Sequence, residues 1–161
     1  MESRNRVRGI AHNKNVAKIT VLGVPDRAGI SAAIFSPLAE KGISVDTIVQ
    51  NASVDHITDL TFTVARADLE EAIATIEPVA TNMGARGCIT DSKLANVSIV
   101  GTGMQHYPGY ASRMFQALYE ADVNIEMITT AEIRITCIVA EDKVEAAVSA
   151  LHKAFQLDEV D

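Results

Sequence analysis

Two segments of this chain have residue patterns that could bind an anion. Gly29 lies near the end of the segment 23–30 and Gly109 near the end of the segment 101–110, and each glycine precedes a stretch with helical apolar spacing. A helix start exposes backbone N–H groups and the positive end of the helix dipole, which together attract a carboxylate. The alternative is an ordinary helix-starting turn capped by Asp26, which the first segment taken alone favours.

The strand that follows the first segment adds side chains suited to an amino acid. Asp46 and Gln50 are four residues apart within 44–53, so both project from one face of a strand. A carboxylate suits an ammonium group and an amide suits a hydroxyl, whereas the alternative is a solvated polar face. In the second half of the chain, Asn124 begins the equivalent segment with free backbone groups. Together these residues could hold an amino acid.

Patterns for catalysis, metals and nucleotides are weak or missing. Gly101 and Gly103 start a nucleotide-binding glycine pattern, but the third glycine falls too late, and no GxxxxGK[ST] or nucleophile elbow occurs. Cys88 and Cys137 lie in apolar strands without metal-like spacing, which predicts buried free thiols, and the four histidines are dispersed. We expect no metal, no cofactor and no catalysis by this chain alone.

The elements that must position these residues occur twice. The segment 8–23 recurs as 86–101, and the likeness continues through the rest of each copy. The first copy follows the order β-α-β-β-α-β and the second repeats it up to the last strand, which predicts two α+β, ferredoxin-like domains with antiparallel sheets and helices on one face. A duplicated module with two different sets of loops forms a pseudo-symmetric interface, a natural place for a small ligand.

The first copy is expected to contain a strand at 16–24, a helix at 29–41, a hairpin of strands at 44–53 and 58–66, a helix at 68–83 and a closing strand at 85–90. The first helix places Ile30, Ile34 and Leu38 four residues apart, facing a core. Asp68 is expected to cap the second helix. Thr61 and Thr63 alternate with apolar residues, which predicts one solvent-exposed and one buried strand face.

The second copy lacks an obvious closing strand. It is expected to contain a strand from 94, a helix at 109–122, a hairpin at 124–141 and a helix carrying Val144, Val148, Leu151 and Phe155. Its last segment, 156–161, is too short and acidic to close the sheet. The repeat-mate of the first closing segment is 8–11. We therefore predict interlaced domains, 13–92 and 93–161, with 1–12 as the fourth strand of the second.

Composition and charge narrow the class of protein. Hydrophobic residues make up 48% and aromatic residues 4%, which indicates aliphatic cores in a soluble protein. Each copy is so small that we expect it to need packing against the other copy or against a second chain to bury an adequate core. The net charge of −7 opposes nucleic acid. No apolar run reaches the ~20 residues of a membrane span, and no signal peptide is visible, so we expect a cytoplasmic protein without membrane contact.

Several motifs, in order, resemble the tandem ACT-domain region of bacterial aspartokinases. They are the segments 16–29, 49–53, 58–63 and 124–133, and the resemblance extends over essentially the whole chain. The family's kinase domain is absent, so the chain resembles the regulatory β subunit of an α2β2 enzyme. The resemblance implies a homodimer, a catalytic α subunit as partner, and feedback control of aspartate phosphorylation toward lysine, threonine and methionine.

The resemblance also implies an effector site shared by two chains. In the family, threonine or lysine, or both, bind between the first ACT domain of one chain and the second of its partner. The matching positions are Asp26, Ala28, Gly29, Ile30, Ser31, Asp46, Gln50, Ser53, Asn124 and Ile125. Ala28 stands where the family often has proline, Ser31 replaces a small residue, and the hairpin around 55–57 is short.

Threonine is the expected effector. Asp46 or a nearby carbonyl would take the ammonium group, the backbone of Gly29 and Ile30 the carboxylate, and Gln50 the hydroxyl. Lysine would need a longer slot with an acidic end, for which Glu126 is available.

Other classes of function fit less well. A ferredoxin-like nucleic-acid module would carry paired strand aromatics and a basic face. A small enzyme would need an identifiable nucleophile or base. A stand-alone amino-acid sensor for another enzyme would use the same residues as the leading hypothesis.

Overall fold

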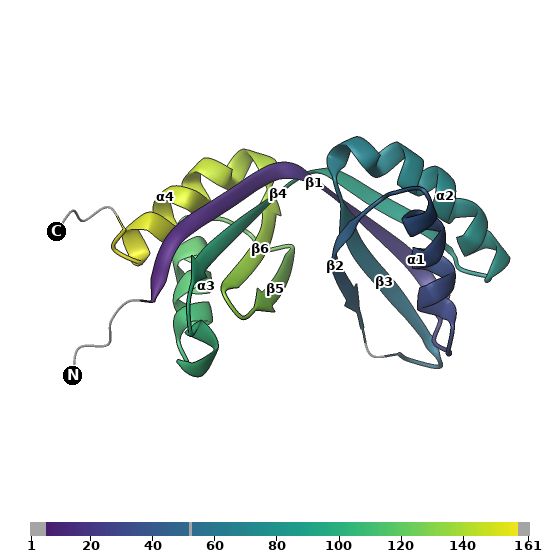
Figure 1. Cartoon of the computed structure of the whole chain (residues 1–161), viewed down its shortest axis with the longest axis horizontal. Helices are drawn as coiled ribbons and strands as arrows, with labels where there is room; N and C mark the ends of the chain where they lie inside the picture. The colour runs from purple at the N-terminus through teal and green to yellow at the C-terminus, as the bar shows by residue number, and fades with distance from the viewer. Residues whose placement is uncertain (1–5, 52, 158–161) are drawn as a thin grey trace. The chain divides into compact units, whose positions relative to one another are not determined.

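The computed structural model describes residues 6–51 and 53–157, which form two compact units. One is Asn15–Ser92, and the other joins the described residues up to Lys14 with those from Lys93 onward. Strands β1 (Val7–Pro25) and β4 (Gly87–Gly101) each run from one unit into the other (Figure 1). The expectation for the chain end falls largely outside the described residues, because 158–161 are not among them.

The two long strands correct the sequence prediction, which split each of them in two. The predicted strands at 7–12 and 16–24 are one strand, and so are the strand at 85–90 and the strand from 94. Neither linking segment contains glycine or proline, so nothing in them stops an extended backbone.

Each unit contains two helices and four strand segments. The first has α1 (Ile30–Glu40), β2 (Val45–Gln50), β3 (Ile57–Val64) and α2 (Leu69–Asn82). The second has α3 (Tyr110–Glu120), β5 (Met127–Ala131), β6 (Arg134–Ala140) and α4 (Val144–Ala154). Hydrogen-bonded neighbours follow the order β2-β3-β1-β4-β6-β5, so β2 and β5 are edge strands. Short 3-10 turns at Arg66–Asp68, Met104–His106 and Glu141–Lys143 connect these elements.

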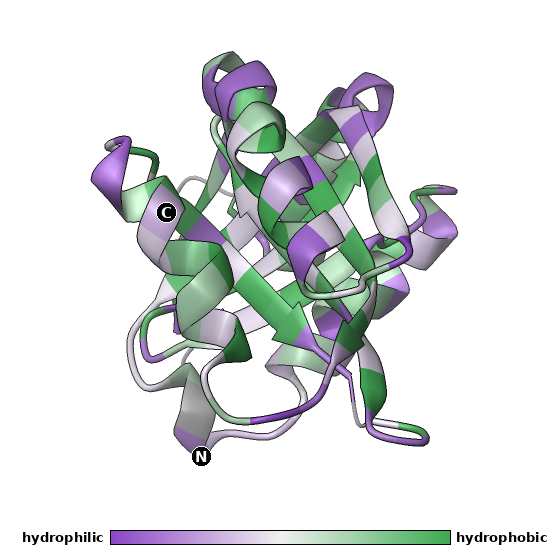
Figure 2. Cartoon of the chain, turned by 90° about the vertical axis from the view of Figure 1, so that its right-hand side faces the viewer, coloured by the Kyte–Doolittle hydropathy of each residue, from purple (hydrophilic) through white to green (hydrophobic). Residues whose placement is uncertain are grey.

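The apolar spacing of α1 gives the buried face that the sequence predicts. Ile30, Ile34 and Leu38 are buried in one core with Leu60 and Phe62 of β3. Hydrophobic and hydrophilic residues alternate in bands along the helices and strands (Figure 2), as expected where one face packs and the other is solvated.

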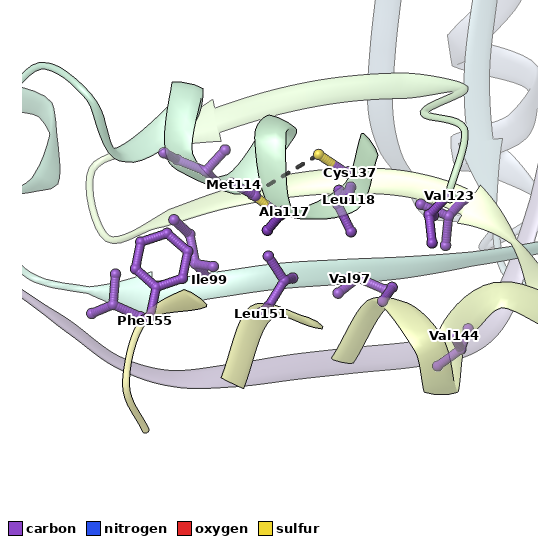
Figure 3. Packing of buried hydrophobic residues seen from close by; sticks show 14 of the residues in the cluster. Val97, Ile99, Met114, Ala117, Leu118, Val123, Cys137, Val144, Leu151 and Phe155 are labelled. Atoms are coloured by element: carbon purple, nitrogen blue, oxygen red, sulfur yellow. Dashed lines mark hydrogen bonds between the residues drawn. The ribbon is translucent and has the colours of Figure 1, made fainter. Parts of the chain in front are cut away.

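The core of the second unit forms in the same way between its sheet and its two helices. Figure 3 shows Val97 and Ile99 of β4 pointing toward Met114 and Leu118 of α3 and toward Leu151 of α4. The predicted apolar face of α4 is confirmed: Val144, Leu151 and Phe155 are buried, and Val148 packs against them. Val7 of β1 is 1% exposed and belongs to this core.

Two local predictions in the first unit are wrong. Asp68 precedes α2, but its side chain makes no capping hydrogen bond. Its φ of −93° and ψ of −2° are not those of an extended cap residue, because the 3-10 turn already carries the chain into the helix. Thr63 is buried rather than exposed to solvent, and its Oγ1 accepts a hydrogen bond of 3.1 Å from the Thr47 N–H.

Shortening Val7 should destabilise the second unit selectively. Val7→Ala removes two buried methyl groups from a core built mainly by residues beyond 93, and we expect a loss of on the order of 2 kcal/mol. Amide exchange should rise in α3 and α4 but not in α1 and α2. His12→Ala, on an exposed part of β1, is the control. Equal effects in both units would contradict the predicted domain boundaries.

The two cysteines differ in environment. Cys137 is buried, and its Sγ donates to Met114 Sδ at 3.9 Å (Figure 3), whereas Cys88 is only half-buried. Burial raises the pKa of the Cys137 thiol from 9.0 to about 12. Burial, and then the nearby Glu77 carboxylate, raise the pKa of Cys88 as well. Both are free thiols, and the predicted burial holds fully for Cys137 alone.

Iodoacetamide at pH 8 should therefore modify Cys88 before Cys137, as mass spectrometry of peptides would show, because only the thiolate reacts. Equal alkylation rates in the folded protein would contradict this assignment.

The raised pKa of Cys137 also has a consequence for stability. The stabilising contribution of the protonated Cys137 thiol is fully present below about pH 9 and is lost as the pH rises from about 9 toward 12. A Cys137→Ala variant should lack this part of the loss of stability at alkaline pH.

Candidate functional site

The two helix starts have the same geometry. Gly29 precedes α1 with φ 89° and ψ −11°, and Gly109 precedes α3 with φ 105° and ψ −19°. No side chain within the described residues caps either helix, so capping by Asp26 is wrong. A Cβ built on either glycine would meet nothing within 4 Å. The space beside each helix start is therefore open, as an anion-binding turn requires, although the Ile30 N–H already donates to the Arg27 carbonyl at 3.4 Å.

The predicted residues of the first loop divide into exposed and buried ones. Asp26, Ala28, Gly29 and Ser31 are exposed beside the start of α1. The Ile30 side chain is 8% exposed and packs in the core, so only its backbone is available to a ligand. Asp26 donates its N–H to the His56 carbonyl at 2.7 Å, which holds the loop against the β2–β3 hairpin.

Strand register places Gln50 near this loop. Pro25, just before the loop, pairs with Ile57, and Gln50 pairs with Leu60, so all of them lie toward one end of the sheet. The Thr58 hydroxyl donates to the Asn51 carbonyl at 2.9 Å, which ties the end of β2 to the start of β3. Ser53 lies in the same connection and is exposed.

Asp46 lies toward the opposite end of β2. Val45 pairs with Val64 and Ile48 with Phe62, which places Asp46 between these two levels of β3. At about 3.3 Å per residue, the strand separates Asp46 from the Ile57 level by roughly 17 to 23 Å. An irregularity in the pairing between Val45 and Ile48 also interrupts the alternation that the sequence assumed. The structure does not bring Asp46 to the loop of its own chain.

Asn124 and Ile125 belong to the other unit. Asn124 is exposed, and its Nδ2 donates to Glu126 Oε1 at 3.4 Å. Ile125 is half-buried and packs against the second core. The burial pattern of 125–130 is identical to that of 45–50, so the two edge strands are built alike.

One polar group in the first unit was missed by the sequence reasoning. Asp59 Oδ1 accepts a hydrogen bond of 3.0 Å from the Gly23 N–H and lies 3.9 Å from Arg86 Nη2. With Asn51, Val54, Asp55, Ile57 and Thr58, these two side chains line a cavity of about 490 Å³. Asp59 of β3 and Arg86, the residue before β4, are far apart in the sequence, so no local pattern signals their proximity.

A second missed feature is a cavity of about 470 Å³ in front of α3. It is lined by Met104, Tyr107, Pro108, Gly109, Tyr110, Ala111, Thr130, Ala131, Glu132 and Ile135. Arg6 holds one of its walls, because Arg6 Nη2 donates to Tyr107 Oη at 2.6 Å. The glycine at 109 signalled the helix start, but nothing in the sequence signalled a cavity there.

The described part of the chain shows neither a metal centre nor a membrane span. Within residues 6–51 and 53–157, no three His, Cys, Asp or Glu side chains are arranged to hold a metal ion. None of the helices described there has the length and apolar character needed to cross a bilayer.

Comparison with known proteins connects this fold to a family. Models described as ACT domain match residues 18–80 and 97–155. An aspartate kinase from Stutzerimonas stutzeri is 47% identical over 152 residues, covering 94% of this chain. The chain spans only 37% of the length of that relative.

Solved structures give the same result. The ligand-free regulatory subunit of aspartate kinase from Thermus thermophilus is 40% identical with a TM-score of 0.88, and the match covers 93% of this chain and 99% of that one. Aspartate kinase from Synechocystis is 38% identical with a TM-score of 0.90, and the match covers 99% of this chain and 28% of that one. These matches show that the chain belongs to the family of tandem ACT-domain regulatory chains of aspartate kinase.

Proposed function

We propose that this chain is a non-catalytic regulatory subunit that binds threonine between the first ACT domain of one chain and the second ACT domain of its partner. Binding would control a catalytic subunit of aspartate kinase in the cytoplasm and so produce feedback inhibition. The observation that carries the proposal is the open, uncapped start of α1, with Asp26 in the loop before it and Gln50 toward the same end of the sheet.

A homodimer through the edge strands would complete this site. Ile48 on β2 is 52% exposed and Ile128 on β5 is 44% exposed, at equivalent places on strands with unpaired edges. Exposed edge strands with apolar residues favour pairing with another chain. Antiparallel pairing with Ile48 opposite the partner's Ile128 puts Gln50 opposite the partner's Glu126, next to the partner's Ile125 and diagonal to the partner's Asn124. The start of one strand thereby meets the end of the other.

Each group of threonine then has a partner in the proposed site. The α1 backbone after Gly29 takes the carboxylate, as the helix dipole favours. Asp26 takes the ammonium group, because Asp46 lies too far along β2. Gln50 takes the hydroxyl, Ser53 and the partner's Asn124 line the polar side, and the partner's Ile125 packs against the methyl group. Lysine remains the second candidate, with Glu126 at the end of a longer slot.

The catalytic partner is proposed from the relatives. A solved structure described as aspartokinase alpha and beta subunits is 39% identical with a TM-score of 0.87, and the match covers 99% of that chain. The curated relative from Stutzerimonas stutzeri is an aspartate kinase almost three times as long as the matched region. A separate catalytic subunit would supply the ATP-dependent phosphorylation of aspartate.

Calorimetric titration with threonine and with lysine, separately, tests the proposal. A ligand that bridges two chains also stabilises the dimer, so the dimer dissociation constant should fall when threonine is present. Analytical ultracentrifugation at several protein concentrations measures that shift. Lack of binding by both amino acids would refute the effector assignment, and binding without any shift in dimerisation would refute the shared site.

A further inference from the structure

We propose that the second ACT domain carries a separate ligand site, the cavity in front of α3, and that this site binds an apolar α-amino acid. The site differs from the threonine site in its residues and its position, so it stands or falls independently of the threonine assignment.

The cavity has the volume and the walls for such a ligand. Its roughly 470 Å³ lies within the range of small-molecule sites, and most of its lining side chains are apolar or aromatic. Met104 and Ile135 are buried at 4% and 7% exposure, so they form a fixed floor. Tyr107 and Tyr110 supply aromatic walls.

Two polar features lie at the border of the apolar space. The N–H groups of Ala111 and Ser112 precede the first intrahelical hydrogen bond of α3, which runs from the Arg113 N–H to the Gly109 carbonyl. These N–H groups suit a carboxylate. Glu132, in the turn between β5 and β6, is the one acidic side chain of the lining and suits an ammonium group. A zwitterion with an apolar side chain matches this combination.

Comparison of the two copies explains why the ligand should be apolar. At equivalent positions, Ser31 of the first loop is replaced by Ala111, and Gln50 of the edge strand is replaced by Thr130. Ala28 is replaced by Pro108. The second copy thus keeps the glycine and the helix start but loses the long amide that would bind a ligand hydroxyl.

Arg6 braces the aromatic wall. Its guanidinium lies 4.1 Å from the centroid of the Tyr107 ring and donates to Tyr107 Oη, and its backbone N–H donates to Tyr110 Oη at 3.1 Å. Both tyrosines that line the cavity are therefore held by the residue just before β1. An occupied cavity should accordingly protect the start of β1 from amide exchange.

Titration of the full chain with L-methionine is the test, with two analogues as ligand controls. L-methionine methyl ester lacks the carboxylate, and N-acetyl-L-methionine lacks the ammonium charge. We expect methionine to bind at one site per chain and each analogue to bind at least about tenfold more weakly, because a charge-assisted hydrogen bond is lost. Equal affinity of methionine and either analogue would overturn the proposal.

Variants locate the site. Ala131→Phe fills the cavity from an exposed strand position and should abolish methionine binding, and Glu132→Gln should weaken it about tenfold. Glu120→Gln, on α3 away from the cavity lining, should change nothing. Circular dichroism and thermal unfolding verify that all three variants fold. Methionine binding that survives Ala131→Phe, or no methionine binding at all, would overturn this proposal. Lack of threonine binding by the unchanged chain would count only against the threonine site.

Discussion

Replacing Gly101 by alanine is expected to be among the most destabilising single changes in this protein. A Cβ at this position would overlap the carbonyl oxygen of Arg6 and lie 3.1 Å from Val7 Cα. These are backbone atoms, so β1 and β4 would have to separate where Val7 enters the second core. We expect a loss of about 3 kcal/mol or more, since overpacking here cannot be relieved by a side-chain rotation.

Gly9→Ala is the matched control for this prediction. Gly9 lies on β1, two residues after Val7, and a Cβ built there would meet nothing within 4 Å. The expected change is within about 0.5 kcal/mol. Thermal unfolding measures the change in stability of both variants, and amide exchange in α3 and α4 shows whether the loss lies in the second unit. Similar melting temperatures for the two variants would contradict the close approach of Arg6 to Gly101.

The internal repeat and the spacing of apolar residues predicted most of the fold. The spacing of Ile30, Ile34 and Leu38 predicted α1, and Val144, Leu151 and Phe155 predicted α4, because one helical face must be buried in each case. The missing closing strand of the second copy pointed to the N-terminal segment, where Val7 indeed joins the second core. Periodicity succeeds here because it reflects burial directly.

Strand lengths and cap details could not be predicted in the same way. Whether two short β patterns form one strand depends on the residues between them, and the polar run from His12 to Asn15 gave no sign of an extended backbone. Asp68 has the right residue type for a cap, but the 3-10 turn before α2 sets its dihedral angles. In both cases the path of the chain, rather than the propensity of single residues, determines the local backbone conformation.

The candidate site was predictable by residue type more than by geometry. Gly29 and Gly109 have the positive φ that a helix-starting glycine permits, and both loops are open. Spacing alone grouped Asp46 with Gln50, whereas the pairing with β3 shows that they lie toward opposite ends of β2. The pair of Asp59 and Arg86, with the Gly23 N–H that donates to Asp59, joins three positions that no single sequence window contains.

Asp26→Asn should weaken threonine binding by about tenfold to a hundredfold. The substitution removes the charge that the proposed site offers to the ammonium group, and hydrogen bonds to charged groups contribute about 1.5 to 3 kcal/mol. The fold should not change, because the contact that holds the loop is the backbone N–H of Asp26 to the His56 carbonyl. Isothermal titration calorimetry gives the dissociation constants, and thermal unfolding verifies the fold.

Asp46→Asn is the control that gives this prediction its meaning, since both variants remove one exposed carboxylate and change the net charge equally. Asp46 lies roughly 17 to 23 Å along the strand from the level of the loop, so the same substitution there should change the threonine dissociation constant by less than about threefold. If Asp46→Asn weakens binding more than Asp26→Asn, the ammonium group is bound at the start of β2, and the helix start of α1 in the same chain cannot hold the carboxylate of that threonine.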